Sequence, residues 1–261
     1  MEIIFLGKNK PSVVKGLQFL FDSRVSIKAI ISSPIKNQNN DENELLKLAE
    51  KYNVPLMSDL ELNSILENKK KCDEKFKKID LVISYLYPKK IKSELIKIAK
   101  IGCINFHPAP LPEFRGVSPY CFGILENFPY WGVTCHFIDN DFDTGDIIQV
   151  KKFDVNLMKE TSFSLEQKSQ KHLFELFKNI TKILFDGKDL PRKKQVNGKY
   201  FSKKDFERLR QINENDSKEL ISKKIRAFWY PPFPGAYIKI KNKEYTIIDD
   251  NMLEKISNER N

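Results

Sequence analysis

The chain has 261 residues, of which 31% are charged and 41% hydrophobic, a balance typical of a folded globular protein. Lys and Arg number 45 against 35 Asp and Glu, a formal net charge of +10, but the lysines are spread along the chain without an arginine-rich or aromatic block, so nucleic-acid binding is not indicated. No apolar run approaches the ~20 residues that span a bilayer, and the first residues lack the features of a signal peptide. We expect a cytoplasmic protein with no membrane partner.

The first hundred residues alternate between predicted strands and helices, as in a Rossmann-like α/β fold with a mostly parallel sheet. The strands are predicted at 3–6, 25–32, 54–57 and 79–85, and the helices at 11–21, 43–52 and 91–98. Asp59 or Asn63 is expected to cap a further helix, and the polar stretch 33–42 is expected to be a loop. The turn at 7–11 is not a G-x-G-x-x-G loop, which argues against a dinucleotide cofactor.

The stretch from 104 to 150 holds most of the residues that could carry chemistry. Residues 104–107 form a predicted strand that Pro108 ends, because proline has no amide hydrogen for a sheet ladder. Side chains alternate along a strand, so Asn105 and His107 share one face while Ile104 and Phe106 share the other. An amide and an imidazole therefore lie side by side at a strand end.

An acidic turn joins the next two predicted strands, at 132–138 and 145–150. Gly145 is free to adopt a positive φ there, and the hairpin places Asp143 at its connection. The aspartates of this turn have a second interpretation, because Asp side chains also stabilise turns by bonding their own backbone.

The cysteines and histidines give no metal-ligand pattern. The four cysteines show no C-x-x-C spacing, so neither a zinc site nor a disulfide framework is indicated, and we expect buried, reduced thiols. His172 falls on the apolar stripe of a predicted helix and is interpreted as structural. His136 is interpreted as a supporting partner and is left outside the catalytic candidates. We expect no bound metal.

The remainder is predicted to contain helices and a hairpin. A helix starts with a capping box of Ser164 and Gln167 and ends at Gly187. Further helices are predicted from Ser202, capped with Asp205, and from Asp216 or Ser217. A proline-rich aromatic run at 226–237 precedes a hairpin with strands at 237–241 and 245–249 around Asn242-Lys243. We divide the chain into a domain at 1–187 and a small C-terminal region at 188–261.

Several stretches, taken together, resemble the folate-dependent formyltransferases, the family of glycinamide ribonucleotide transformylase, methionyl-tRNA formyltransferase and the sugar N-formyltransferases. These stretches are Asn105-Phe106-His107-Pro108, Leu111-Pro112, Arg115-Gly116 and Asp143-Thr144-Gly145. The resemblance covers about residues 1–186. It implies that the first domain is the catalytic domain, that Asn105, His107 and Asp143 are the catalytic set, and that N10-formyltetrahydrofolate is the formyl donor.

The donor site implied by the resemblance lies where two turns converge at the carboxyl edge of the sheet, the usual place for ligands of open α/β sheets. Its expected cofactor-binding residues are Tyr85, Leu86, Tyr87, Pro88, Ile138, Asp139, Asn140 and Asp141. For Tyr85 and Tyr87 the alternative is ordinary packing at the end of a strand.

The run at 226–237 resembles the C-terminal region of bacterial formyltransferases that act on nucleotide-linked amino sugars, the GDP-perosamine N-formyltransferases most of all. This implies a nucleotide-sugar substrate with a 4-amino-4,6-dideoxy sugar, GDP-perosamine or a dTDP-linked relative, on the route to O-antigen. Arg115, Tyr120 and Trp229 are the expected substrate-binding residues, with a surface salt bridge as the alternative for Arg115. The aromatic run could instead pack on the first domain or form a dimer contact, and we expect a homodimer.

The chemistry of formyl transfer assigns a role to each candidate. Asn105 can donate to the oxyanion of the tetrahedral intermediate. His107 can donate to the same oxygen or accept the proton of the attacking amine. Asp143 would orient or charge-balance His107. The sequence leaves the acid and base roles of His107 and Asp143 open.

Other members of the family fit less well. Methionyl-tRNA formyltransferases suit the positive charge but carry a sizeable C-terminal β-barrel, whereas about 60 residues follow Tyr200. Glycinamide ribonucleotide transformylases have a glycine-rich phosphate turn where this chain has Gly-Lys-Asn-Lys, and formyltetrahydrofolate hydrolases have an additional N-terminal domain. A nucleic-acid-binding protein with a vestigial site has only the charge in its favour.

Overall fold

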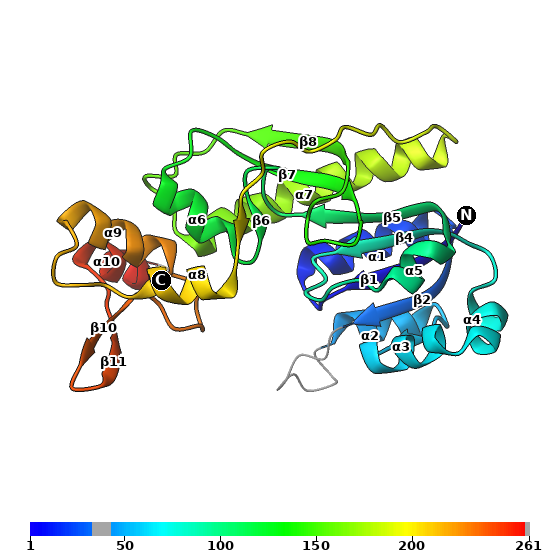
Figure 1. Ribbon diagram of the computed structural model, residues 1–261, viewed down its shortest axis with the longest axis horizontal. Coiled ribbons are helices and arrows are strands. Elements are labelled where there is room, and N and C mark those ends of the chain that lie inside the picture. Colours follow the sequence, from blue (N-terminus) through cyan, green and yellow to red (C-terminus); the bar gives the residue numbers. More distant parts are fainter. Residues whose placement is uncertain (33–42, 259–261) are drawn as a thin grey trace.

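A seven-stranded sheet organises the first part of the chain in the computed structural model (Figure 1). The strand order is β3-β2-β1-β4-β5-β7-β8. The strands are β1 (Glu2–Gly7), β2 (Ser26–Ser32), β3 (Leu56–Met57), β4 (Ile79–Tyr85), β5 (Ala99–His107), β7 (Trp131–Phe137) and β8 (Ile147–Phe153). The structure describes residues 1–32 and 43–258, so the predicted loop at 33–42 lies outside the described residues.

The first five strands of the sheet run parallel, while β7 and β8 are antiparallel to their neighbours. Helices cover both faces, with α1 (Pro11–Asp22), α2 (Glu44–Lys51) and α7 (Ser162–Phe185) on one, and α3 (Asp59–Glu67), α4 (Lys69–Phe76) and α5 (Ser93–Ile98) on the other. The mostly parallel, Rossmann-like α/β fold is confirmed.

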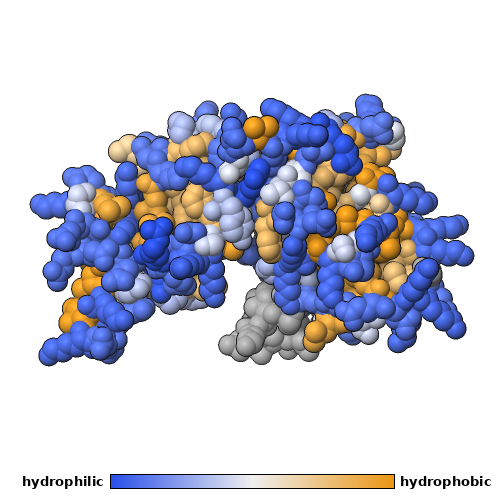
Figure 2. Space-filling view, viewed as in Figure 1, coloured by the Kyte–Doolittle hydropathy of each residue, from blue (hydrophilic) through white to orange (hydrophobic). Residues whose placement is uncertain are grey.

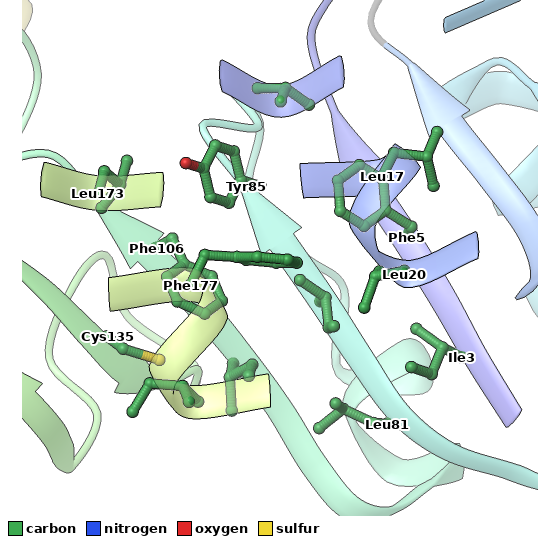
Figure 3. Close-up of a cluster of buried hydrophobic side chains, with 14 of the residues drawn as sticks. Ile3, Phe5, Leu17, Leu20, Leu81, Tyr85, Phe106, Cys135, Leu173 and Phe177 are labelled. Atoms are coloured by element: carbon green, nitrogen blue, oxygen red, sulfur yellow. The ribbon is translucent and has the colours of Figure 1, made fainter. Parts of the chain in front are cut away.

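Each face of the sheet has its own hydrophobic core, because successive side chains of a strand point to opposite faces. Phe5 and Phe106 belong to the core beneath α1 and α7, whereas Leu6 belongs to the core beneath α3 and α5. Figure 3 shows the first of these cores, with Tyr85 and Phe177 among its labelled side chains. Since Phe106 points into this core, its neighbours Asn105 and His107 face the other side, as the alternation predicted.

Two predicted helix starts are wrong. Ser58 caps α3 in a capping box with Glu61, so Asp59 is already inside the helix. The cap of α7 is Thr161, three residues before the predicted cap Ser164, and the Thr161 side chain accepts a hydrogen bond from the Ser164 amide. In both cases a hydroxyl one or more residues upstream satisfies the free amides of the first turn, which is what defines the cap.

The C-terminal region contains β9 (Tyr200–Phe201), α8 (Lys203–Arg210), α9 (Lys218–Ala227), β10 (Tyr237–Ile240), β11 (Lys243–Thr246) and α10 (Asp250–Asn258). Ser202 and Asp205 form the predicted capping box of α8, and Ser217 caps α9. The hairpin turn is Lys241-Asn242, one residue earlier than predicted, because both residues have the positive φ that a two-residue hairpin turn requires.

A third hydrophobic core joins the C-terminal region to the first part of the chain. It includes Phe114, Trp131 and residues of α6 (Pro119–Glu126), and it also includes Phe228 from the end of α9. The short strand β6 (Arg115–Gly116) pairs with β9 across the same boundary. Figure 1 shows the C-terminal helices beside α6, with the β10–β11 hairpin projecting away from the body. None of the described helices is both long and apolar enough to cross a membrane.

Candidate active site

Four polar side chains meet at the carboxyl edge of the sheet. Asn105 and His107 extend from the end of β5, His136 extends from β7, and Asp143 lies in the turn between β7 and β8. The Nδ1 atom of His107 lies 3.6 Å from Oδ1 of Asp143, and Nε2 of His136 lies 3.5 Å from the same oxygen. The structure thus brings the three predicted catalytic candidates together and adds His136 to them.

His107 is buried, with 5% of its surface exposed, and its tautomer follows from its contacts. Its Nε2 atom lies 2.8 Å from the carbonyl oxygen of Phe114, which can only accept, so Nε2 carries the hydrogen. In the neutral ring Nδ1 is therefore unprotonated and faces Asp143. Burial lowers the pKa of His107 despite the opposing effect of Asp143, so the ring is neutral near pH 7.

His136 fixes the orientation of the Asn105 amide. Its Nδ1 atom donates to the Phe137 carbonyl oxygen at 2.7 Å, so in the neutral ring Nε2 accepts from Nδ2 of Asn105 at 3.1 Å. On the other side of the amide, the Ser84 hydroxyl donates to Oδ1 of Asn105 at 2.8 Å. These bonds use one of the two Nδ2 hydrogens, and the second makes no hydrogen bond to the described residues.

Asp143 has a left-handed backbone, with a φ of 57°. Gly145 does not have the positive φ that the sequence suggested. A glycine is needed at position 145 for a steric reason, because a Cβ there would lie 2.0 Å from the Phe137 carbonyl oxygen. The Oδ2 atom of Asp143 accepts a hydrogen bond from the Gly116 amide at 2.9 Å.

The charge state of Asp143 follows from its surroundings. Burial alone would raise the pKa of its carboxyl group, but the positive charges that His107 and His136 carry when they are protonated, together with the Gly116 amide, hold that pKa well below its ordinary value. Asp143 is therefore a carboxylate at neutral pH. The site combines a neutral imidazole, an adjacent anion that would stabilise the protonated ring, and an oriented amide donor.

The expected donor-binding residues occupy the two turns beside this set. Leu86 has a positive φ of 55° after β4, and Tyr87 lines a small pocket of about 60 Å³ with Leu6, Leu62 and Ile91. In the other turn, Ile138 is partly buried, while Asp139, Asn140 and Asp141 are exposed. Pro88 is exposed as well.

Two of these residues have evident structural roles. The Asp139 carboxylate accepts from the Thr144 hydroxyl and the Asp141 amide, as a turn former does. The Tyr85 ring lies in the core of Figure 3 against Phe106 and Phe177, on the face of the sheet opposite to Asn105. Their part in donor binding stays a prediction.

A second polar cluster lies after β1, and we call it the β1–α1 cluster. It comprises Lys8, Lys10, Ser12, Tyr85, Tyr120, Glu166, Gln170 and Tyr230. Glu166 bonds both Lys10 and the Tyr230 hydroxyl. Lys8 lies beside this network, and burial, followed by the charge of Lys10, lowers its pKa to about 8.

Three buried polar atoms of the β1–α1 cluster have no properly formed hydrogen bond to the described residues. They are the hydroxyls of Tyr85 and Tyr120 and the Nε2 atom of Gln170. The Tyr85 hydroxyl lies near Ser12 and the Tyr120 hydroxyl near Gln170, but neither pair has hydrogen-bond geometry. Buried polar groups are normally paired, so these atoms are suited to a ligand.

The other two expected substrate-binding residues lie elsewhere. Nε of Arg115 donates to Oε1 of Gln195 at 3.0 Å, and its guanidinium packs against Gly198. Trp229 is partly buried and packs on the third hydrophobic core. Tyr120 alone of the three belongs to the β1–α1 cluster.

Several contributors to the site carried no signal in the sequence. The Phe114 carbonyl and the Gly116 amide are backbone groups, and Gln195 is a single polar residue in an irregular segment. Ser84, by contrast, was placed in a predicted strand next to the expected site, and its register opposite Asn105 could have been anticipated from the parallel pairing of β4 with β5.

All four cysteines are free and buried. Among the residues that the structure describes, no group of three or more His, Cys, Asp or Glu side chains is arranged to hold a metal ion.

The site at the carboxyl edge of the sheet contains a neutral imidazole, a carboxylate and an oriented amide. These groups suit an enzyme that transfers a group at a carbonyl carbon. Residues 1–180 match the family model described as formyl transferase. The chain belongs to the formyl transferase family.

Curated relatives include two kinds of formyltransferase. Methionyl-tRNA formyltransferase of Wolbachia sp. subsp. Drosophila simulans is 29% identical over 258 residues, covering 95% of this chain and 80% of the relative. GDP-perosamine N-formyltransferase of Brucella melitensis is 31% identical over 169 residues, covering 64% of each chain.

Solved structures of sugar formyltransferases share the fold. WlaRD, a sugar 3N-formyl transferase solved in the presence of dTDP and 5-N-formyl-THF, is 26% identical with a TM-score of 0.71, covering 94% of this chain and 84% of that one. A 4-N formyltransferase from Francisella tularensis has a TM-score of 0.74 at 23% identity, covering 95% of this chain and 96% of that one.

Proposed function

We propose that the protein transfers a formyl group from N10-formyltetrahydrofolate to the amine of a nucleotide-linked 4-amino-4,6-dideoxy sugar, such as GDP-perosamine or a dTDP-4-amino sugar. The product would serve surface-glycan synthesis such as that of O-antigen. The observation that carries the proposal is the pairing of a neutral His107 with an ionised Asp143 beside the free Nδ2 hydrogen of Asn105.

The residues divide the reaction between them. The sugar amine attacks the formyl carbon, and Asn105 donates its free amide hydrogen to the oxyanion that forms. The proton that leaves the amine passes to Nδ1 of His107, the only unprotonated nitrogen of that ring, where the Asp143 carboxylate stabilises it. Collapse of the intermediate breaks the bond from the formyl carbon to N10, and the proton is returned to N10.

This assignment makes His107 the base and Asp143 the anion that stabilises the imidazolium. A hydrogen bond from Nε2 to the Phe114 carbonyl persists in both protonation states, so the ring need not turn during the cycle. The alternative, in which Asp143 accepts the amine proton directly, is disfavoured because its pKa is depressed and it is a weak base.

The turns after β4 and β7 suit the folate donor. They flank Asn105 and offer backbone groups beside apolar side chains such as Leu86, Tyr87 and Ile138, a combination that can hold a flat heteroaromatic ring. The formyl-folate present in the WlaRD structure supports the same kind of donor for this chain.

The β1–α1 cluster suits the phosphates or hydroxyls of the acceptor. Within the cluster as defined, Lys8 and Lys10 accompany the carboxylate of Glu166, so positive charge is in excess, and the Tyr85 and Tyr120 hydroxyls have no hydrogen-bond partner among the described residues. Gly7 pairs with Tyr85, and Tyr85 pairs with Phe106. The cluster therefore starts two strand spacings, about 10 Å, from the end of β5. That span lies within reach of a nucleotide sugar.

Methionyl-tRNA is the second candidate acceptor. The Wolbachia methionyl-tRNA formyltransferase is similar over 95% of this chain, and a net charge of +10 is compatible with RNA. A panel of amines formylated by the purified protein distinguishes the candidates. Turnover of a nucleotide amino sugar supports the proposal, whereas turnover of methionyl-tRNA alone would replace it.

The expected homodimer is retained as part of the proposal. Ile240 and Tyr245 of the β10–β11 hairpin are exposed, as is Ile248 after it, and Figure 2 shows apolar residues on that projecting hairpin. Sedimentation equilibrium at several protein concentrations tests this directly.

A further inference from the structure

Asp143 is held in place from outside its own hairpin by residues 193–201, which we call the strap. Lys193 exchanges two backbone hydrogen bonds with Ile147 at the start of β8, at 2.8 and 2.9 Å. The end of the strap forms β9, which pairs with β6. The strap therefore bonds to the chain on both sides of the candidate carboxylate.

Gln195, in the middle of the strap, makes three hydrogen bonds with its side-chain amide. Its Nε2 atom donates to the carbonyl oxygens of Asp143, at 2.9 Å, and Gly145, at 2.6 Å. Its Oε1 atom accepts from Nε of Arg115 at 3.0 Å. The contacts fix the amide orientation, since only the NH2 group can donate to carbonyls and only the oxygen can accept from a guanidinium.

The hydrogen bond from Gln195 is made to the backbone of Asp143, which has an unfavourable conformation. A φ of 57° is rare outside glycine, and a residue keeps such a backbone conformation only where its surroundings hold it there. Gln195 stabilises this conformation, because it donates hydrogen bonds to the carbonyl oxygens on both sides of Thr144 in the turn.

The carboxylate of Asp143 is held by the strap as well, through β6. Its Oδ2 atom accepts from the Gly116 amide, and Gly116 lies so close to the strap that a Cβ would come 2.3 Å from the Phe201 carbonyl oxygen. Backbone and side chain of Asp143 are thus both fixed by the same segment.

We propose that Gln195 is a positioning residue for formyl transfer, holding Asp143 so that its carboxylate faces Nδ1 of His107. Arg115 acts in this arrangement through its bond to Gln195 rather than by binding phosphate. The kinetic consequence rests on the proposed function, but the effect on His107 can be measured without any acceptor.

The test compares Gln195→Met, Gln195→Glu and Val196→Ala. Methionine keeps the approximate length of the side chain without its hydrogen bonds. Glutamate keeps its size but turns an oxygen toward two carbonyl oxygens, so it should be at least as harmful. Val196 is 68% exposed on the same strap and serves as the control. We expect both Gln195 variants to lower kcat roughly tenfold to hundredfold, as a misplaced catalytic group does, with little change in either KM.

A second readout separates positioning from loss of folded protein. The groups facing the His107 ring are the Asp143 carboxylate, His136 and the Phe114 carbonyl. Because the Asp143 carboxylate favours the protonated ring, its displacement should lower the pH at which the His107 imidazole titrates by NMR. The midpoint pH of the acid limb of kcat/KM should fall by the same amount. Loss of folded protein would reduce the NMR signal and the measured rate, but it would leave the midpoint pH of the His107 titration and of the kcat/KM profile unchanged.

The outcomes are distinct. Normal turnover in Gln195→Met, or reduced turnover with an unmoved His107 titration, would overturn the positioning role. Full activity in Gln195→Glu would also contradict it, because size alone would then suffice. If the wild-type protein formylates no nucleotide sugar, the proposed function fails, while a shift of the His107 titration in Gln195→Met would still support the positioning role.

Discussion

The Nδ1 atom of His107 faces Oδ1 of Asp143 across 3.6 Å, and it is the nitrogen that lacks a hydrogen in the neutral ring. The Phe114 carbonyl fixes that tautomer from the other side of the imidazole. A proton taken up by His107 must therefore arrive between the ring and the carboxylate. This geometry supports our proposal that His107 is the base, a division of roles that the sequence left open.

The first prediction concerns the two residues of β5. Asn105→Ala removes the oxyanion donor and His107→Ala removes the base, so each should lower formyl transfer by roughly a hundredfold or more. Circular dichroism and Tm should show that the variants remain folded. His172→Ala is the control, since that ring stacks on Phe153 away from the site. Near-normal turnover in either β5 variant would remove that residue from the mechanism.

The second prediction concerns pH. Burial holds the pKa of His107 below its ordinary value of 6.5, and the ring must be neutral to accept a proton. The value of kcat/KM should therefore be high at neutral pH and fall as the pH drops below 6.5. Asp143→Asn removes the charge that favours the imidazolium, so the acid limb should move to lower pH and kcat should fall by at least ~100-fold.

A pH–rate profile of both proteins checks this. An acid limb at or above pH 6.5 in the wild type, or one that moves upward in Asp143→Asn, would contradict the assignment of His107 as the base.

The third prediction tests the β1–α1 cluster. Lys8→Met keeps a similar volume but removes the charge, so the KM of a nucleotide-linked acceptor should rise about tenfold, the effect of one charged hydrogen bond. The KM of the folate should not change. Since the pKa of Lys8 is lowered to about 8, the acceptor KM of the wild type should also rise above that pH, and this rise should be absent in Lys8→Met.

The control for this variant is Lys15→Met, at an exposed lysine on α1, the helix that follows Lys8. If Lys15→Met raised the acceptor KM as much as Lys8→Met does, the effect would be one of general charge and not of the cluster.

The fourth prediction concerns Trp229, which the sequence placed in the substrate site. Its partly buried ring packs on the third hydrophobic core, so Trp229→Ala should cost about 2 kcal/mol of stability, below the range for a fully buried Trp. The matching fall in Tm is about 4–8 °C, with unchanged KM values. Phe233→Ala, at a ring that is 66% exposed, should leave Tm unchanged. A higher acceptor KM with normal Tm would instead return Trp229 to the substrate site.

The sequence predicted the fold well where a local pattern determines structure. The alternation in β5 placed Asn105 and His107 on one face, and that followed from strand geometry alone. Helix starts were less predictable, because Ser58 and Thr161 compete with equally plausible polar neighbours. The short helix α4 was missed, since only Cys72 and Phe76 among its described side chains are buried and no apolar stripe marks it.

The site was only partly predictable for a different reason. Asp143 could be found from its motif, but the groups that set its charge and position come from distant segments. The Gly116 amide and the Gln195 side chain reach it through the pairing of β6 with the strap. Contacts of this kind depend on tertiary structure, and no local spacing of residues in the sequence predicts them.

The most direct test of the account is a formyl-transfer assay with N10-formyltetrahydrofolate and a panel of amines. The panel contains GDP-perosamine, dTDP-linked 4-amino and 3-amino dideoxy sugars, methionyl-tRNA and glycinamide ribonucleotide, each with the wild-type protein and His107→Ala. We predict transfer to a nucleotide-linked 4-amino sugar that is lost in His107→Ala. Formylation of methionyl-tRNA alone, or equal transfer by His107→Ala, would contradict the account.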